Sequence, residues 1–169
     1  FKDSEKGKKE QVADMFDKIA PKYDAMNRVL SARTDIGWRK KAINMLRKDS
    51  PQHILDVATG TADMAIMTCK MLNPEKIDGI DISVGMLEPG RKKIEKEQLI
   101  HKIELHTGDS ETINFADNTF DAVMVAFGVR NFENLEKGLN EMKRVLKPGG
   151  RLIVLEFSKP RRKLIKSFY

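Results

Sequence analysis

The chain has 169 residues, of which 40% are hydrophobic and 33% are charged, and its formal net charge is +6. This length is typical of one domain with one core, so it argues against a two-domain organisation. The basic excess is compatible with an anionic partner, but a solvated surface of mixed charge explains most of it.

Helical spacing dominates the first fifty residues. Residues 10–20 carry apolar side chains at positions i, i+3, i+4 and i+7, and Pro21 ends this helix. A second, shorter helix is expected around 23–30, and a third over about 35–48, before Pro51. The N-terminal part is therefore predicted to be all-helical.

After Pro51 short apolar runs alternate with helical segments. The expected strands are 54–57, 77–81, 103–106, 122–127 and 152–157, and the helices between them are 61–72, 85–99 and 133–146. This alternation predicts right-handed βαβ units in an α/β fold with a doubly wound, mostly parallel, Rossmann-like sheet. Ligands of such sheets bind beyond the carboxyl ends of the strands, so the residues that follow each run are the candidates for a site.

The first expected strand leads into a loop of small residues that opens a helix. The stretch from Asp56 through Gly60 and Thr61 to Asp63 would let a ligand lie against main-chain N–H groups. A dinucleotide fold has three glycines in such a loop to admit a pyrophosphate, whereas this loop has only Gly60. The pattern argues against NAD and leaves room for a ligand without phosphates.

Acidic and polar residues also follow the next two strands. Asp81 can accept hydrogen bonds from both ribose hydroxyls, and Asp109-Ser110 offers oxygens for an adenine amine, with Ile82 and Met86 as apolar walls. Each aspartate taken alone is equally well explained as a helix N-cap. Their occurrence at three successive strand ends favours a nucleoside site, which adenosine bearing an amino acid fits.

Several features point away from other chemistries. Cys69 is the only cysteine, which suits a core thiol in a reducing compartment, and His53, His101 and His106 lack metal-ligand spacing, so no metal site is expected. Residues 147–150 (Lys-Pro-Gly-Gly) predict a type II turn. No segment has the length of a membrane span or the order of a signal peptide, so we expect a cytoplasmic protein.

Two longer stretches carry a family resemblance. Residues 23–31 (Tyr-Asp-Ala-Met-Asn-Arg-Val-Leu-Ser) with Trp38, and residues 144–158, match the two ends of a known pattern. On these motifs the chain resembles the ubiquinone/menaquinone biosynthesis C-methyltransferases along nearly its whole length. One position departs, because Asp35 stands where the family usually has His.

The resemblance implies a methyltransferase that uses S-adenosyl-L-methionine to methylate the quinol ring of demethylmenaquinone, or of a ubiquinone precursor. It also implies that Thr61, Asp81, Asp109 and Ser110 contact the cofactor. The strand-end pattern adds Asp56, Gly60 and Ile82 as expected cofactor contacts. A hydroxyl residue of the family is replaced by Ala126, so one side-chain contact is expected to be missing. The family also continues beyond residue 169 with a helical segment and two strands.

A ring carbon becomes nucleophilic when the neighbouring quinol hydroxyl loses its proton. Arg130, in the segment 127–131 after the fourth strand, could stabilise the phenolate or orient a water that removes the proton. A surface ion pair is an equally good interpretation of Arg130. Tyr23 and Asn131 are the expected substrate contacts, and the remaining candidates for an apolar acceptor pocket are Phe16, Met26 and Trp38.

The whole chain, 1–169, is expected to form one domain. Within it, residues 1–50 form a helical extension on the acceptor side, 51–158 the cofactor-binding core, and 159–169 a basic tail. The lipophilic quinol requires visits to the inner face of the membrane, where the tail could meet anionic lipid, although an ordinary solvated segment explains it equally well. The sequence leaves the oligomeric state open, a homodimer included.

Three alternatives stay open at this point. One is a methyltransferase of RNA, although no exposed stripe of aromatic and basic residues is apparent, so no nucleic-acid partner is expected. Another is an N- or O-methyltransferase of a small metabolite, which would share the core motifs but not the two end stretches. The third is a cofactor-binding module without catalysis.

Overall fold

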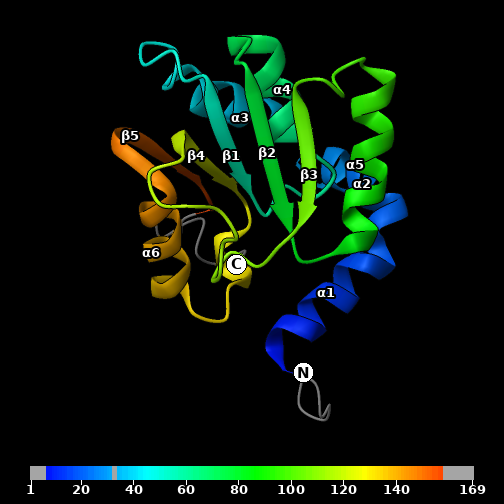
Figure 1. Ribbon diagram of the computed structural model, residues 1–169. Coiled ribbons are helices and arrows are strands. Elements are labelled where there is room, and N and C mark those ends of the chain that lie inside the picture. Colours follow the sequence, from blue (N-terminus) through cyan, green and yellow to red (C-terminus); the bar gives the residue numbers. More distant parts are fainter. Residues whose placement is uncertain (1–6, 32–33, 158–169) are drawn as a thin grey trace, which may run out of the picture.

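A computed structural model describes residues 7–31 and 34–157, so the basic tail lies outside the described residues (Figure 1). The strands are β1 (His53–Val57), β2 (Lys76–Asp81), β3 (Ile103–Thr107), β4 (Phe120–Ala126) and β5 (Leu146–Leu155). They form one sheet in the order β3-β2-β1-β4-β5, in which every pair of neighbouring strands is parallel. The predicted parallel α/β architecture is confirmed.

The N-terminal part is helical, as expected. Its elements are α1 (Lys8–Ile19), the single 3₁₀ turn η1 (Ala20–Lys22), α2 (Tyr23–Leu30) and α3 (Thr34–Asn44). Pro21 sits inside the 3₁₀ turn that ends α1, because proline has no N–H to continue the α-helical pattern. Figure 1 shows α1 beyond the arrowheads of β2 and β3, next to α5, so the extension covers the carboxyl ends of the strands.

The core helices are α4 (Asp63–Leu72), α5 (Val84–Lys96) and α6 (Leu135–Val145). The side chain of Ser83 accepts a hydrogen bond from the backbone of Met86 and caps α5, and Asn134 does the same for Lys137 at the start of α6. The Asn134 cap explains why α6 begins two residues later than its apolar periodicity suggests.

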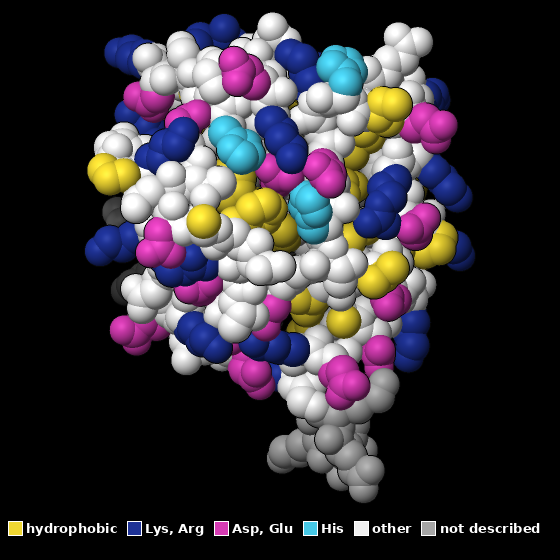
Figure 2. All heavy atoms as spheres, viewed as in Figure 1, with side chains coloured by type: hydrophobic (Ala, Val, Ile, Leu, Met, Phe, Trp, Pro, Cys, Tyr) yellow, Lys and Arg dark blue, Asp and Glu magenta, His cyan; other side chains and the backbone are white. Residues whose placement is uncertain are grey.

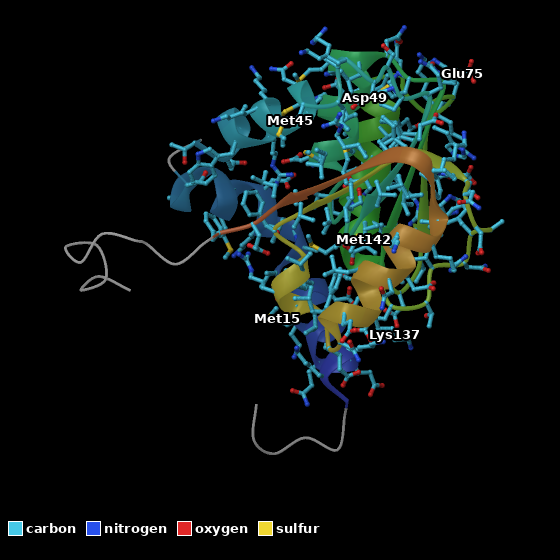
Figure 3. All side chains as sticks on the ribbon, turned by 90° about the vertical axis from the view of Figure 1, so that its left-hand side faces the viewer. Met15, Met45, Asp49, Glu75, Lys137 and Met142 are labelled. Atoms are coloured by element: carbon cyan, nitrogen blue, oxygen red, sulfur yellow. The ribbon has the colours of Figure 1, made fainter. Side chains whose placement is uncertain are left out.

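The central strands β1 and β4 are largely buried on both faces, and their alternating side chains divide the core in two. Ile54 and Met124 belong to the cluster that packs against α3, α4 and α5, whereas Leu55 and Val123 belong to the cluster that packs against α6. Met142, labelled in Figure 3, is fully buried between α6 and the sheet. Cys69 is buried on α4, in agreement with the predicted core thiol.

Strand β5 begins at Leu146, six residues before the predicted start. Leu146 pairs with Phe120, and the ladder then shifts register before Arg151 pairs with Ala122. The residues between contain the expected turn, with Gly149 at φ +80°, so the turn is built into the strand as a bulge. A side chain at Gly150 would lie 2.8 Å from the carbonyl oxygen of Asp121, which leaves room only for glycine.

The order of the strands determines where a ligand fits. From β1 the chain adds β2 and β3 on one side, and then crosses back to place β4 and β5 on the other. The connections from β1 and β4 therefore diverge at their carboxyl ends and leave a crevice between them, which is where doubly wound sheets bind ligands.

Candidate functional site

A pocket occupies this crevice and is covered by α1. It is lined by Lys9, Val12, Phe16, Tyr23, Ala58, Gly60, Asp81, Ile82, Gly108, Asp109, Ser110, Glu111, Ala126, Phe127, Gly128, Asn131, Phe132 and Glu133. The structure thus brings together seven predicted site residues, namely Tyr23, Gly60, Asp81, Ile82, Asp109, Ser110 and Asn131. They come from four separate strand ends and from the N-terminal extension.

The loop between β1 and α4 has an unusual backbone. Ala58, Gly60 and Ala62 alternate with residues of negative φ and adopt positive φ values of 53°, 57° and 62°. Left-handed backbone is disfavoured for residues with a Cβ atom, so small residues limit the strain. A Cβ on Gly128 would lie 2.6 Å from the Cβ of Ala58, so this glycine lets the loop after β4 approach the loop after β1.

Asp81 is fixed at the floor of the pocket by main-chain donors. Its Oδ2 accepts from the N–H of Gly60 at 2.8 Å, and its Oδ1 accepts from the N–H of Ser83 at 2.9 Å. Burial raises the pKa of the Asp81 carboxyl, and these backbone hydrogen bonds offset only part of that effect. Each oxygen keeps a further acceptor site, so the carboxylate can receive two vicinal hydroxyls.

Asp109 is held from the other side of the pocket by α1. The ammonium of Lys9 lies 2.6 Å from Asp109 Oδ2 and 2.9 Å from Glu111 Oε2. The hydrogen bond to Asp109 raises the pKa of Lys9. Lys8 also donates to the carbonyl oxygen of Phe132 at 2.6 Å. Two adjacent lysines of α1 thus bind residues that line the pocket and hold the helix over it. Sequence reasoning missed Lys9, because nothing local links it to a residue 100 positions away.

The stretch 23–31, which carries the family resemblance, contacts the loop after β1 through Asp24. The hydroxyl of Thr61 donates to Asp24 Oδ1 at 2.6 Å, and Lys93 of α5 donates to Asp24 Oδ2 at 2.8 Å and to Asp63 Oδ1 at 2.6 Å. Thr61 therefore does not line the main pocket. Its hydroxyl ties the helical extension to the loop.

A second, smaller cavity lies behind this loop. Its lining consists of Tyr23, Arg39, Asp56, Ala58, Thr59, Gly60, Thr61, Asp63, Met64 and Ala126. Asp56 is 1% exposed and accepts a hydrogen bond from the Thr59 hydroxyl at 2.7 Å. Burial raises the pKa of Asp56 to about 7, although the Thr59 hydroxyl and the nearby Arg39 charge act in the opposite direction.

Asp35, the departure from the family pattern, is buried in α3 close to this cavity. Its Oδ1 accepts from the hydroxyl of Ser31 at 2.7 Å, and its Oδ2 lies 3.7 Å from Nε of Arg39, one turn further along. A carboxylate thus faces the buried guanidinium at the position where the family pattern has an imidazole.

The side chain of Arg130 forms a surface ion pair, which is the second interpretation that the sequence allowed. Its Nη1 lies 2.9 Å from Glu156 Oε1, its side chain is 50% exposed, and its guanidinium lies over the ring of Phe157. Arg130 is not among the residues that line the pocket, whereas its neighbour Asn131 is.

The aromatic candidates of the extension separate into two groups. Phe16 and Tyr23 line the pocket, with their rings 6.0 Å apart in an edge-to-face arrangement. Met26 and Trp38 do not line it and are 42% and 40% exposed. The Trp38 ring instead packs edge-on against Phe157, with the ring centroids 5.7 Å apart, and does not line the pocket.

On one face of the sheet, outside the pocket lining, the structure gathers histidines that show no pattern in the sequence. The Nε2 atoms of His53 and His106 each lie 2.7 Å from an oxygen of Asp78, which is 1% exposed. Asp78, Glu104 and His106 come close enough to hold a metal ion, although spacing along the chain indicated no metal site. Figure 2 shows this face of the sheet, where histidine, acidic and basic side chains gather beside hydrophobic ones.

Comparisons with known proteins agree with this geometry. Residues 4–169 match the sequence profile of the ubiE/COQ5 methyltransferase family. The demethylmenaquinone methyltransferase of Bacteroides fragilis is 54% identical over 167 residues, which cover 98% of this chain and 68% of that protein. The ubiquinone/menaquinone biosynthesis C-methyltransferase of Geobacter sulfurreducens is 45% identical over 98% of this chain and 64% of its own length.

Solved structures support the fold. A SAM-dependent methyltransferase from Aquifex aeolicus superposes with a TM-score of 0.62 at 27% identity, covering 72% of this chain and 66% of that one. The [4+2]-cyclase SpnF superposes with a TM-score of 0.72 at 22% identity over 86% of this chain and 59% of its own, which is a likeness of fold alone. The chain spans about two thirds of the length of the curated relatives described above.

Proposed function

Because the chain belongs to the ubiE/COQ5 methyltransferase family, we propose that it transfers the methyl group of S-adenosylmethionine to a ring carbon of reduced demethylmenaquinone. That it is an S-adenosylmethionine-dependent methyltransferase follows from the family. The quinol acceptor is supported by the names of two relatives that cover nearly the whole chain. The observation that carries the proposal is the pocket in the crevice between the connections that follow β1 and β4. In this pocket the Asp81 carboxylate is fixed where a ribose would lie, and aromatic rings line the walls.

The residues present fit an adenosine without phosphates. Asp81 presents its carboxylate beside Gly60, where it would accept both ribose hydroxyls. Asp109 and Ser110 would receive the adenine amine, with Ile82 as an apolar wall. When bound, the cofactor supplies a methyl group on a positively charged sulfur, which is the electrophile of the reaction.

Methyl transfer is an in-line displacement, so the protein acts chiefly by positioning and by excluding water. Phe16 and Tyr23 from the extension and Phe127 and Phe132 from the loop after β4 form the apolar wall of the pocket. This wall suits a planar quinol ring, and α1 closes it through Lys8 and Lys9. The Asn131 side of the pocket would receive the polar substituents of the ring.

Arg130 is our candidate for stabilising the phenolate that makes the ring carbon nucleophilic. To do so its guanidinium must turn from Glu156 toward the pocket, where Asn131 already lies. We expect Arg130→Ala to lower kcat at least tenfold while cofactor affinity stays unchanged. Glu156→Gln, which removes the competing carboxylate, should retain activity. Normal turnover by Arg130→Ala would contradict the catalytic role and leave the ion pair with Glu156 as the role of Arg130.

The proposed reaction is tested with cofactor carrying an isotopically labelled methyl group. Incubation with reduced demethylmenaquinone should yield labelled menaquinone and S-adenosylhomocysteine in equal amounts. Asp81→Ala should yield neither, since it removes the ribose acceptor. Binding of the cofactor without transfer to the quinol would overturn the acceptor and favour another small metabolite.

We also propose that the chain meets its lipophilic substrate at a membrane surface. None of the helices in the described part of the chain is long and apolar enough to cross a bilayer. Exposed apolar side chains occur on α2 and just after α3, with Val29 78% and Met45 56% exposed. Flotation with anionic vesicles should recover the protein, and the replacement of Val29 and Met45 by Ser should reduce that recovery.

A further inference from the structure

Arg39 of α3 reaches the smaller cavity behind the loop between β1 and α4. The residue is 8% exposed, so its guanidinium is withdrawn from solvent. Asp56, Thr61 and Met64 line the same cavity. Nothing in the reaction described above uses this arginine.

The guanidinium of Arg39 is poorly paired for a buried charge. Within the described part of the chain its Nε is buried and has no hydrogen-bond partner. Asp35 Oδ2 lies 3.7 Å from that atom, beyond hydrogen-bond distance, and Asp35 Oδ1 already accepts from Ser31. The ring of Phe127 is a further neighbour, with its centroid 5.2 Å from Cζ. A buried guanidinium N–H without an acceptor is costly, so an anion that enters the cavity would be favoured.

The cavity also holds a buried carboxylate. Asp56 accepts a hydrogen bond from Thr59 and lies close enough to Arg39 for the charge of the arginine to lower its pKa, against the stronger effect of burial. A cavity with one buried cation and one buried carboxyl group matches an α-amino acid head group, which carries a carboxylate and an ammonium.

The two cavities are adjacent. Tyr23, Ala58, Gly60 and Ala126 line both the main pocket and the smaller cavity. A ligand whose ribose is held by Asp81 in the main pocket can therefore pass Gly60 and place its other end beside Arg39.

We propose that Arg39 binds the carboxylate of the methionine moiety of S-adenosylmethionine. The inference rests on the proposed function, because it takes that cofactor as the ligand of the main pocket. Asp81 then holds the ribose and Arg39 the amino acid, so the sulfur between them is fixed at both ends. In-line transfer requires this position to be fixed.

Decarboxylated S-adenosylmethionine, which lacks only the carboxylate, tests the proposal directly. By isothermal titration the wild-type chain should bind S-adenosylmethionine at least about tenfold more tightly than the decarboxylated form, as expected for a charge-assisted hydrogen bond. Arg39→Met should bind the two ligands equally, with the affinity for the decarboxylated form nearly unchanged. Arg39→Lys, which keeps the charge, should restore part of the difference.

The matched control is Arg47→Met, which removes an exposed arginine shortly after α3 and should leave the discrimination intact. Binding of the decarboxylated ligand shows that a variant is folded. Equal affinity of the wild-type chain for the two ligands, or full discrimination by Arg39→Met, would overturn the role of Arg39. Failure of the wild-type chain to bind either ligand would instead contradict the proposed function.

Discussion

The two ends of the sheet use aspartates in opposite ways. At the carboxyl ends of the strands, Asp56 and Asp81 are buried against hydroxyl and backbone donors, and burial raises their pKa values. Toward the amino ends, burial also acts on Asp78 and Asp121, but histidine and lysine partners outweigh it and lower their pKa values. Asp78 and Asp121 are held by partners from neighbouring strands and support the fold, whereas Asp81, whose contacts described above are backbone N–H groups, is available to a ligand.

The amino-terminal end joins strands that are distant in sequence. Asp78 of β2 receives His53 from β1 and His106 from β3. Asp121 of β4 accepts the backbone N–H of His53 at 2.7 Å and the ammonium of Lys147 at 2.7 Å. These contacts connect all five strands of the sheet.

The loops at the carboxyl-terminal end also carry backbone strain. Ala58, Ala62 and Phe127 have positive φ values although they carry side chains. Each such residue costs about 1–2 kcal/mol relative to ordinary backbone. Ser50 and Asn118, before β1 and β4, share this conformation, so strain occurs at both ends of the sheet, and ligand binding would offset only the part beside the pocket.

The largest expected effect is on the ligand end. Asp81→Ala removes the acceptor for both ribose hydroxyls, so S-adenosylmethionine should bind roughly 100-fold more weakly or worse, because charge-assisted hydrogen bonds contribute about 1.5–3 kcal/mol each. Isothermal titration measures this loss. Asp78→Ala is the control at the other end, and comparable weakening in both variants would remove the distinction between the ends.

The next effect is on stability. Asp78→Ala leaves two histidines without their carboxylate partner and should lower the free energy of unfolding by about 2–3 kcal/mol in urea. Glu104→Gln, which alters the contacts of an exposed carboxylate with Lys76 and His106, should change it by less than about 1 kcal/mol. A wild-type urea midpoint for Asp78→Ala would show that the histidine cluster does not support the fold.

The pH dependence of stability separates the two ends. The raised pKa of Asp56 makes a contribution that is complete below about pH 4 and is lost as the pH rises toward about 7. The lowered pKa of Asp78 acts oppositely, since its contribution is present above about pH 4 and is lost as the pH falls below that value.

Asp56→Asn removes only the first of these terms. Between pH 5 and pH 8 the variant should therefore lose about 2 kcal/mol less stability than the wild-type chain, by the relation of about 1.4 kcal/mol per pKa unit. Urea unfolding at both pH values measures the difference. An unchanged loss of stability between them would mean that Asp56 titrates normally.

The smallest expected effect concerns the stability contributed by Arg39. Without ligand, Arg39→Met removes the charged neighbour of the buried Asp35 carboxylate and should lower the free energy of unfolding by about 1 kcal/mol. Thermal melting without cofactor tests this, with Arg47→Met as the exposed comparison. An unchanged or higher melting temperature would show that the arginine contributes no stability in the absence of ligand.

The architecture was predictable because its signals are local. Apolar spacing and short apolar runs located the α-helices and strands of the described residues, and the aspartates at strand ends indicated the pocket, since parallel strands bring their carboxyl ends to one edge. Boundaries were less accurate where one contact decides them. The cap at Asn134 shortens α6, and the pairing of Leu146 with Phe120 lengthens β5.

What the sequence by itself determined is therefore the alternation of elements, the family motifs and seven of the residues that line the main pocket. The tertiary structure alone decided the pairing of Lys9 with Asp109, the contact of Asp24 with Thr61, and the position of Arg39 behind the loop. Each of these joins residues far apart along the chain, and such contacts leave no periodic trace in sequence because they depend on how the helical extension docks on the finished sheet.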